Sequence, residues 1–187
     1  WPADVQLIGK DILRVHATIW PVMLMHLGME MPKLLYTHGH IQSGGRKMSK
    51  TIGNTISIDE MLEKFGVDGT RYLLMSAGTF GEDVDVAMER MIEKYNADLA
   101  NGIGNLVSRV LKLSLISNIQ IPISNKISNP NDKILNFIDK IEMDSALGYI
   151  LDIVRKDDKY IEENKPWELV KTDKAKFEKV MQKLVSD

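Results

Sequence analysis

The sequence predicts an α/β segment followed by an all-α segment, with a small connecting module between them. Three observations support this fold class. A buried-strand pattern at residues 5–8 runs into a helical pattern, a glycine- and lysine-rich loop occupies residues 43–50, and long amphipathic helices begin near Val86. We therefore divide the chain into three domains at residues 1–31, 32–85 and 86–187.

The first segment reads as one strand and one helix. The strand ends at Gly9, and Asp11 stands where the N-cap of a helix accepts backbone N–H bonds. Gly28 supplies the stop of this helix, and Pro32 prevents its continuation. Side chains of its apolar face recur at helical spacing, at Ile12, His16, Ile19, Met23 and Leu27.

The connecting module begins with a predicted strand at residues 34–41, which leads to the glycine turn and the lysine loop. Ser57 and Glu60 then form a capping box that opens a helix, and Gly66 closes it. A second short helix follows over residues 68–76. The module is thus a strand, a loop and two short helices.

The last segment is helical by its spacing. Apolar residues recur with a helical period from Val86 to Val110, then over residues 134–141 and again over residues 146–161. The period returns after Pro166, which fits the first turn of the last helix. Residues 117–132 are rich in Asn, Ser, Ile and Pro and read as a connection. These helices predict a bundle.

Composition bounds the class of protein. The chain has 187 residues, 44% of them hydrophobic, which is ample for a core. It has no cysteine, so neither disulfides nor a cysteine-ligated zinc site can form. No apolar run approaches ~20 residues, so we expect a cytoplasmic protein with no membrane partner. The net charge of −2 argues against bulk attraction to nucleic acid but leaves RNA contacts by local Lys and Arg clusters open.

The most informative motif is Lys47-Met48-Ser49-Lys50-Thr51, which follows Gly44 and Gly45. Two lysines three apart on a glycine-supported loop can close on a polyphosphate, although such loops are usually solvated surface. The motif resembles the KMSKS signature of class I aminoacyl-tRNA synthetases, with Thr51 keeping the hydroxyl of the last serine. The resemblance implies that Lys47 and Lys50 are catalytic, that they stabilise the pyrophosphate leaving ATP, and that Ser49 lies in the ATP site.

The flanking motifs extend this resemblance. Residues 8–12, His16, Trp20-Pro21, Asn54, residues 57–60 and residues 68–72 follow one another in an order similar to that of methionyl-tRNA synthetases, through essentially the whole chain. The resemblance implies the second half of a Rossmann-like catalytic domain, a KMSKS-bearing module that contacts the tRNA stem, and an anticodon-binding bundle. It also implies activation of methionine with ATP and Mg²⁺, and transfer to tRNA(Met).

Three residues of the first segment are candidates for the substrate sites. Gly9 and Asp11 stand where a strand meets a helix, a place that is either a plain turn and cap or a nucleotide site. The resemblance favours ATP ribose binding. His16 reads from the residues alone as a core histidine, whereas the resemblance places it in the methionine pocket, beside the thioether.

The bundle carries a second candidate site. Asn105 and Arg109 are four apart on one helix face, and Trp167 opens another helix. An amide, a guanidinium and an indole suit single-stranded bases, although each is more often a solvated or packing residue. The resemblance implies that they read the CAU anticodon. Asp158 stands where the family suggests Asn and adds negative charge nearby.

Several interpretations accompany this one. The chain begins at Trp1 and lacks a HIGH-type motif, since His38-Gly39-His40 differs in form and place. We therefore expect a C-terminal fragment that is inactive alone, with any zinc-binding insertion lying upstream. The alternatives are a leucyl, isoleucyl, valyl or cysteinyl relative, or a non-catalytic RNA-binding protein descended from a synthetase. The sequence leaves the oligomeric state open.

Overall fold

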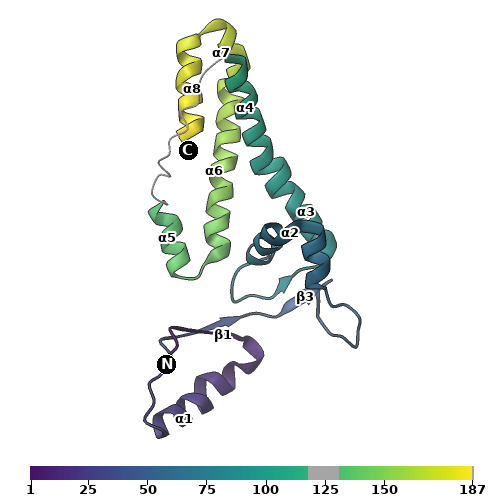
Figure 1. The fold of residues 1–187 in the computed structure, drawn as a ribbon, viewed down its shortest axis with the longest axis vertical. Coiled ribbons are helices and arrows are strands. Elements are labelled where there is room, and N and C mark those ends of the chain that lie inside the picture. The colour runs from purple at the N-terminus through teal and green to yellow at the C-terminus, as the bar shows by residue number, and fades with distance from the viewer. Residues whose placement is uncertain (118–130, 187) are drawn as a thin grey trace. The chain divides into compact units, whose positions relative to one another are not determined.

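The computed structural model describes residues 1–117 and 131–186, which form two compact units, Trp1–Arg90 and Met91–Asp187 (Figure 1). The first unit holds the five strands of the described residues, and the second is helical. The connection predicted at residues 117–132 falls almost wholly on residues 118–130, outside the described residues. The α/β and all-α segments of the prediction are thus both present.

The first unit opens with a parallel pair of strands. β1 (Val5–Gly9) pairs with β2 (Leu34–His38), and the register sets Gly9 opposite His38. The crossover between them is helical and consists of η1 (Lys10–Ile12), η2 (Val15–Ile19) and α1 (Trp20–His26). Gly28 follows with φ +65°, a conformation that favours glycine, so the predicted strand, helix and helix stop are confirmed.

The start and the apolar face of this crossover differ from the prediction. Gly9, not Asp11, is the N-cap, because η1 is a 3₁₀ turn that already contains Asp11. The next turn, η2, is a π-helix, which rotates later side chains away from the face that a 3.6-residue period predicts. The predicted apolar face is exposed both before and after η2: Ile12, Ile19, Met23 and Leu27 are 43%, 54%, 55% and 67% exposed, and Leu24 is the buried residue of α1.

The strand predicted at residues 34–41 is two strands. β3 (Ile41–Ser43) belongs to a second sheet, in which it pairs antiparallel with β4 (Arg46–Lys47) and parallel with β5 (Val84–Asp85). The break falls at Gly39, where a Cβ would lie 2.0 Å from the carbonyl oxygen of Glu82. This close approach of two backbones explains both the glycine and the break.

We expect Gly39→Ala to destabilise the first unit by about 1–3 kcal/mol or more, because the methyl group meets backbone that cannot rotate away. Urea denaturation of the two proteins measures the difference. Gly148→Ala is the matched control: Gly148 lies inside a helix of the second unit, and a Cβ added there would have nothing within 4 Å, so this change stabilises by about 0.5–1 kcal/mol. Equal stability of Gly39→Ala and the parent would contradict the close approach.

α2 (Ile58–Met75) completes the first unit. Its N-cap is Ser57, as predicted, but the Ser57 side chain makes no capping hydrogen bond, so the predicted capping box marks the position of the helix start without its bonds. Gly66 has φ 70° and ψ 178° and interrupts the helix, which confirms the predicted division into two segments. The buried face of α2 includes Met61, Phe65 and Leu73.

The second unit is a set of packed helices. Its helical chain begins within α3 (Met88–Tyr95), at Met91, and continues through the π-helix η3 (Asn96–Gly104) into α4 (Asn105–Ser117). One helix was predicted after Pro166, but the structure has two, because Asp173 leaves the helical conformation and its carboxylate accepts from Lys176 N at 3.0 Å. The remaining helices are α5 (Asp132–Asp139), α6 (Met143–Asn164), α7 (Pro166–Thr172) and α8 (Lys174–Ser186).

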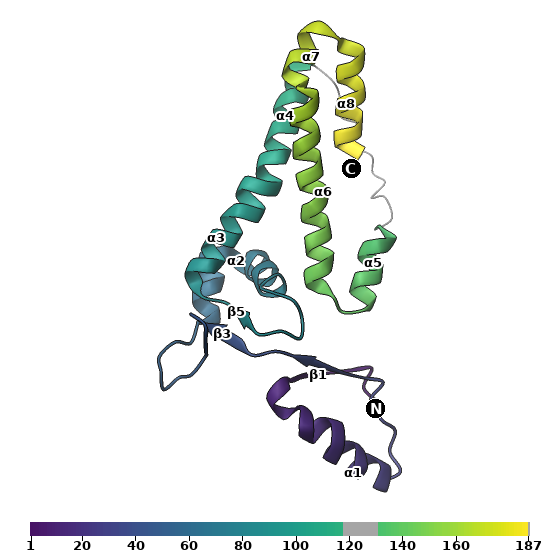
Figure 2. The ribbon, with the colours of Figure 1, turned by 180° about the vertical axis from the view of Figure 1, so that it is seen from behind.

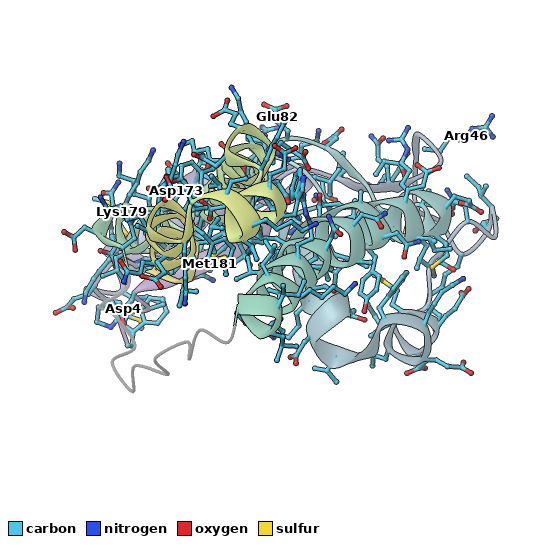
Figure 3. The ribbon with its side chains drawn as sticks, turned by 90° about the horizontal axis from the view of Figure 1, so that it is seen from above. Asp4, Arg46, Glu82, Asp173, Lys179 and Met181 are labelled. Atoms are coloured by element: carbon cyan, nitrogen blue, oxygen red, sulfur yellow. The ribbon has the colours of Figure 1, made fainter. Side chains whose placement is uncertain are left out.

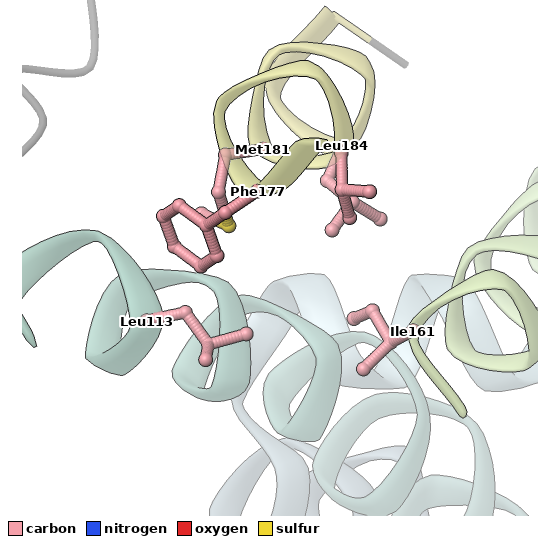
Figure 4. Close-up of a cluster of buried hydrophobic side chains, with 6 residues drawn as sticks. Leu113, Ile161, Phe177, Met181 and Leu184 are labelled. Atoms are coloured by element: carbon pink, nitrogen blue, oxygen red, sulfur yellow. The ribbon is translucent and has the colours of Figure 1, made fainter. Parts of the chain in front are cut away.

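The core of this unit lies where α4, α6 and α8 meet, and Figures 1 and 2 show these helices running beside one another. Figure 4 shows Phe177, Met181 and Leu184 of α8 directed toward Leu113 of α4 and Ile161 of α6. Phe177 and Ile161 are 1% and 0% exposed, so these helices are held by close apolar packing. Among the described residues, no helix is both long and apolar enough to cross a membrane.

Candidate functional site

The lysine loop is introduced by a glycine turn that one carboxylate holds. Gly44 and Gly45 have φ +63° and +72° and connect β3 to β4. The Asp85 carboxylate accepts from both of their backbone N–H groups, at 3.0 Å from Gly44 N and 2.8 Å from Gly45 N. Asp85 therefore fixes the turn from which Lys47 follows two residues later.

The environment of Asp85 favours its charged form. Burial of the side chain, which is 10% exposed, opposes ionisation, but the N–H groups of Ala87, Gly45 and Gly44 and the guanidinium of Arg90 outweigh it and lower the Asp85 pKa. The Arg90 Nη1 atom lies 3.5 Å from Asp85 Oδ2. Asp85 is thus a carboxylate at any pH near neutral.

The lowered pKa predicts a loss of stability in acid. A carboxylate with a lowered folded pKa stabilises the folded state above its ordinary value of 3.8, and this contribution disappears as the pH falls through the folded pKa. We expect the free energy of unfolding of the first unit to fall below about pH 4 more steeply in the parent than in Asp85→Asn. Urea titrations from pH 6 to pH 2.5 measure this, and parallel curves for the two proteins would contradict it.

The base of the lysine loop is closed by Asn54. Its Oδ1 accepts from Ser49 N at 2.8 Å, and its Nδ2 donates to the carbonyl oxygens of Ser43 and Lys47 at 3.4 and 3.3 Å. Beyond this closure the backbone turns again, because Gly53 N donates to Ser49 O at 3.1 Å and to Lys50 O at 3.2 Å. Asn54 thus links both sides of the segment that carries the lysines.

The structure brings the loop to the end of β1. Lys47 Nζ lies 3.7 Å from Asp11 Oδ2, and both side chains are more than half exposed. Gly9 leaves the room for this carboxylate, because a Cβ at Gly9 would lie 2.8 Å from Asp11 Oδ1. Lys50 is exposed in the turn, and the neighbouring Arg46 projects away from the ribbon in Figure 3. The two segments that meet therefore carry five of the predicted site residues: Gly9, Asp11, Lys47, Ser49 and Lys50.

Asp83 ties the same two segments together from another side. Its carboxylate forms an ion pair with Lys10, accepts from His40 N at 2.7 Å and accepts from Gln42 Nε2 at 3.2 Å. The hydrogen bond from Lys10, followed by that from His40, lowers the Asp83 pKa. Asp83 and Asp85 were not predicted from the sequence, in which their one signal is a pair of acidic residues two apart around Val84.

His16 lies in η2, where contacts with Ile12 and Trp20 orient its ring. Its Nδ1 atom is 3.0 Å from the carbonyl oxygen of Ile12, so a hydrogen bond there requires the proton on Nδ1 and leaves Nε2 for another partner. The ring packs edge-on against Trp20 at 5.9 Å between centroids, and Trp20 packs edge-on against Trp1 at 5.7 Å. His16 is half-buried and retains one ring nitrogen for another partner.

The second candidate site lies in the bundle. Arg109 of α4 binds two carboxylates of α6, with Nη1 3.1 Å from Asp158 Oδ1 and Nη2 2.5 Å from Glu162 Oε1. The negative charge that the sequence placed nearby at Asp158 is therefore the ion-pair partner of Arg109. Asn105 is exposed at the start of α4, and the Trp167 side chain is 43% exposed.

The turn before Trp167 is unusual. Lys165 has φ 45° and ψ 60°, a left-handed conformation, and it ends α6 and begins α7. Pro166 is buried in the first turn of α7, as the sequence predicts, and the exposed Trp167 comes next. Helices α4 and α7 contact one another, so Asn105, Arg109 and Trp167 stand on adjoining helices.

The described residues offer no metal site of their own. No group of three or more His, Asp or Glu side chains lies close enough together to hold a metal ion in the part of the chain that the structure describes. The first candidate site instead combines the ammonium groups of the lysine loop with the exposed carboxylate of Asp11. This set of donors suits a phosphorylated ligand with hydroxyl groups.

A family model gives the class of protein to which this fold and this site correspond. The model described as tRNA synthetases class I (M) matches residues 2–111, more than half of the chain, so the chain belongs to this family. Similar curated proteins identify the member of this family that the chain resembles, because they are methionine–tRNA ligases. One from Caldanaerobacter subterraneus subsp. tengcongensis is 39% identical over 183 residues, and a chloroplastic/mitochondrial one from Arabidopsis thaliana is 36% identical over 197 residues.

The relatives are much longer than this chain. The matches cover 91% and 99% of the chain but 29% and 32% of the two relatives, so the chain spans about a third of their length. Among solved structures, Mycobacterium tuberculosis methionyl-tRNA synthetase in complex with methionyl-adenylate matches with a TM-score of 0.79 and 31% identity. That match covers 99% of this chain and 39% of the other. The class I synthetase fold of the chain is thereby established.

Proposed function

We propose that this chain is part of a methionine–tRNA ligase, to which it contributes the KMSKS loop and anticodon recognition. The observation that carries the proposal is the 3.7 Å approach of Lys47 Nζ to Asp11 Oδ2, which joins the two predicted ATP-binding segments. The methionine–tRNA ligases among the relatives and the methionyl-adenylate in the similar solved structure support the choice of substrate. The complete enzyme activates methionine and transfers it to tRNA(Met).

The chemistry assigned to the first site is transfer of a nucleotide to a carboxylate. The methionine carboxylate attacks the α-phosphorus of ATP, the bond to the bridging oxygen of pyrophosphate breaks, and pyrophosphate leaves. Lys47 and Lys50 stabilise the charge that grows on the leaving group, and Ser49 adds a hydroxyl donor. Asp11 accepts hydrogen bonds from the ribose hydroxyls, and Gly9 lets the ribose approach.

His16 is assigned to the methionine pocket. A methionine side chain is long, unbranched and polarizable, and contact between its sulfur and a ring is worth about 0.3–1.5 kcal/mol. The His16 ring is fixed by Ile12 and Trp20, so its second nitrogen and its edge have a defined orientation. An oriented ring is what a site needs to distinguish a thioether from a branched aliphatic chain.

The bundle is assigned to the anticodon. Trp167 stacks on an unpaired base, while the Asn105 amide and the Arg109 guanidinium bond to base edges. The exposure of Asn105 and Trp167 supports this assignment. Arg109 has five N–H donors, and the two carboxylates that it meets leave donors for an RNA base.

Mg²⁺ enters this proposal with ATP. The described residues do not fit a protein-held magnesium site, since they form no cluster of acidic ligands and the lysine loop is cationic. Magnesium is commonly held by substrate phosphates with one or two protein ligands. We therefore assign the ion to the ATP phosphates and no metal ligand to this part of the chain.

Exchange of pyrophosphate into ATP by the full-length enzyme tests the function. We expect exchange that depends on methionine and not on leucine, isoleucine, valine or cysteine at equal concentration. Exchange that depends on one of the other amino acids would move the chain to another specificity of class I. A folded full-length protein without exchange for any amino acid, but with tRNA binding, would identify a non-catalytic RNA-binding protein.

A further inference from the structure

Two aspartates flank Val84 in and beside the short strand β5, and they bind the two segments of the nucleotide site. We propose that Asp85, supported by Asp83, is a positioning residue for adenylation that sets the separation between the loop lysines and the Gly9–Asp11 turn. This inference rests on the proposed function of the lysine loop and goes beyond it. The proposed function gives Asp83 and Asp85 no contact with ATP or methionine, so their role in the reaction is indirect.

Asp85 holds the turn of the β3–β4 hairpin by hydrogen bonds. The β3–β4 ladder has two residue pairs, Gln42 with Lys47 and Ser43 with Arg46, so the ladder alone gives little control of direction. Asp85 adds two charge-assisted hydrogen bonds at the turn that closes this ladder. Such bonds are about twice as strong as neutral ones, so the carboxylate fixes the direction in which the chain leaves toward Lys47.

The opposite segment is held by the residue that directly precedes β5. Asp83 pairs with Lys10, which directly precedes Asp11, and it also accepts from the backbone of His40. The strand itself is anchored, because Val84 N donates to His40 O at 2.9 Å and Val86 N donates to Gln42 O at 2.9 Å. Asp83 and β5 therefore hold the ribose side and the phosphate side of the proposed site next to one another.

The contacts of Asp83, Asp85 and Lys47 form a closed ring together with the backbone segments that connect them. Starting at Asp11, the ring passes to Lys47 across 3.7 Å, along the hairpin to Gly45, across 2.8 Å to Asp85, along β5 to Asp83, and through Lys10 back to Asp11. A closed ring transmits a local change to every member. Loss of the Asp85 contact thus displaces Lys47 relative to Asp11 through the backbone of the hairpin.

Asp85→Asn in the full-length enzyme tests the proposal. The amide keeps the size of the side chain but removes its charge. Its NH₂ group cannot accept a hydrogen bond, so one of the two oxygens that hold Gly44 N and Gly45 N is lost. We expect kcat for methionine-dependent pyrophosphate exchange to fall about 10- to 100-fold, the loss that a displacement of about 1 Å produces, with the KM for methionine unchanged. Asp4→Asn is the control, because Asp4 forms an ion pair with Lys33 at 2.5 Å but is 81% exposed and lies outside the ring.

A double-mutant cycle separates positioning from a general loss of stability. If Asp85 acts through Lys47, Asp85→Asn has little further effect in a Lys47→Ala enzyme. Two outcomes would overturn this inference alone. In the first, the losses in kcat from Asp85→Asn and Lys47→Ala multiply in the double variant. In the second, Asp85→Asn has the parental kcat while Lys47→Ala is severely impaired. If Lys47→Ala itself leaves the rate unchanged, the proposed role of the loop fails, and the inference fails with it. Thermal unfolding of each variant verifies that the assays compare folded proteins.

Discussion

Replacing Lys50 with alanine in the full-length enzyme is expected to reduce the rate of methionyl-adenylate formation about 100- to 1,000-fold, or ~2.7–4 kcal/mol in the activation free energy. Lys50 is exposed in a turn that the Asn54 and Gly53 hydrogen bonds define. An ammonium group in such a loop engages the pyrophosphate as its charge grows, and less before. The change therefore lowers kcat and kcat/KM together, with a small rise in the KM for ATP.

Stopped-flow or quenched single-turnover assays at saturating ATP measure this adenylation rate directly. Lys64→Ala is the matched control, because Lys64 is an exposed lysine in α2 of the same unit and belongs to neither candidate site. We expect the control to adenylate at the parental rate. A Lys50→Ala enzyme with unchanged kcat and a raised KM for ATP would assign Lys50 to ground-state binding and contradict the role in the transition state.

The features that could be predicted from the sequence are those set by residues close to one another in the chain. Strand β1, the crossover helix with its stop at Gly28, and the interruption of α2 at Gly66 follow from short patterns, and the structure has each of them. The N-cap at Asp11 was wrong because a 3₁₀ turn takes up the first residues after β1, and such a turn has no distinct side-chain pattern. The π-helical turn η2 was not predicted either, because it too has no distinct side-chain pattern.

Contacts between residues that are far apart in the sequence could not be predicted from these short patterns. The break at Gly39 arises from the backbone of Glu82, which lies beyond α2 in the sequence and meets Gly39 only in the folded chain. The hold of Asp85 on Gly44 spans 41 residues, and the pairing of Arg109 with Asp158 spans 49. Sequence motifs identified the lysine loop and its chemistry, but only the fold reveals which side chains hold it.

The largest expected effect in the second unit concerns recognition of the anticodon. We expect the full-length enzyme to bind an anticodon stem-loop bearing CAU more tightly than the same hairpin with one anticodon base changed. Trp167→Ala removes a stacking surface worth about 1–3 kcal/mol, which is about 5- to 150-fold in Kd. Asn105→Ala and Arg109→Ala remove edge contacts of similar size and reduce the preference for CAU. Fluorescence anisotropy at one fixed physiological salt concentration measures all four proteins.

The control distinguishes base recognition from attraction to phosphates. Lys112 is an exposed cation on the same helix as Arg109, and Lys112→Ala is expected to weaken both hairpins by the same factor. Arg109 also differs from Lys112 in its ion pairs, since its removal leaves Asp158 and Glu162 without their partner and adds repulsion toward RNA. The preference for CAU, not the affinity alone, is therefore the decisive quantity. Equal binding of both hairpins by the folded parent enzyme would reduce the interaction to phosphate attraction and withdraw the anticodon assignment from Asn105, Arg109 and Trp167.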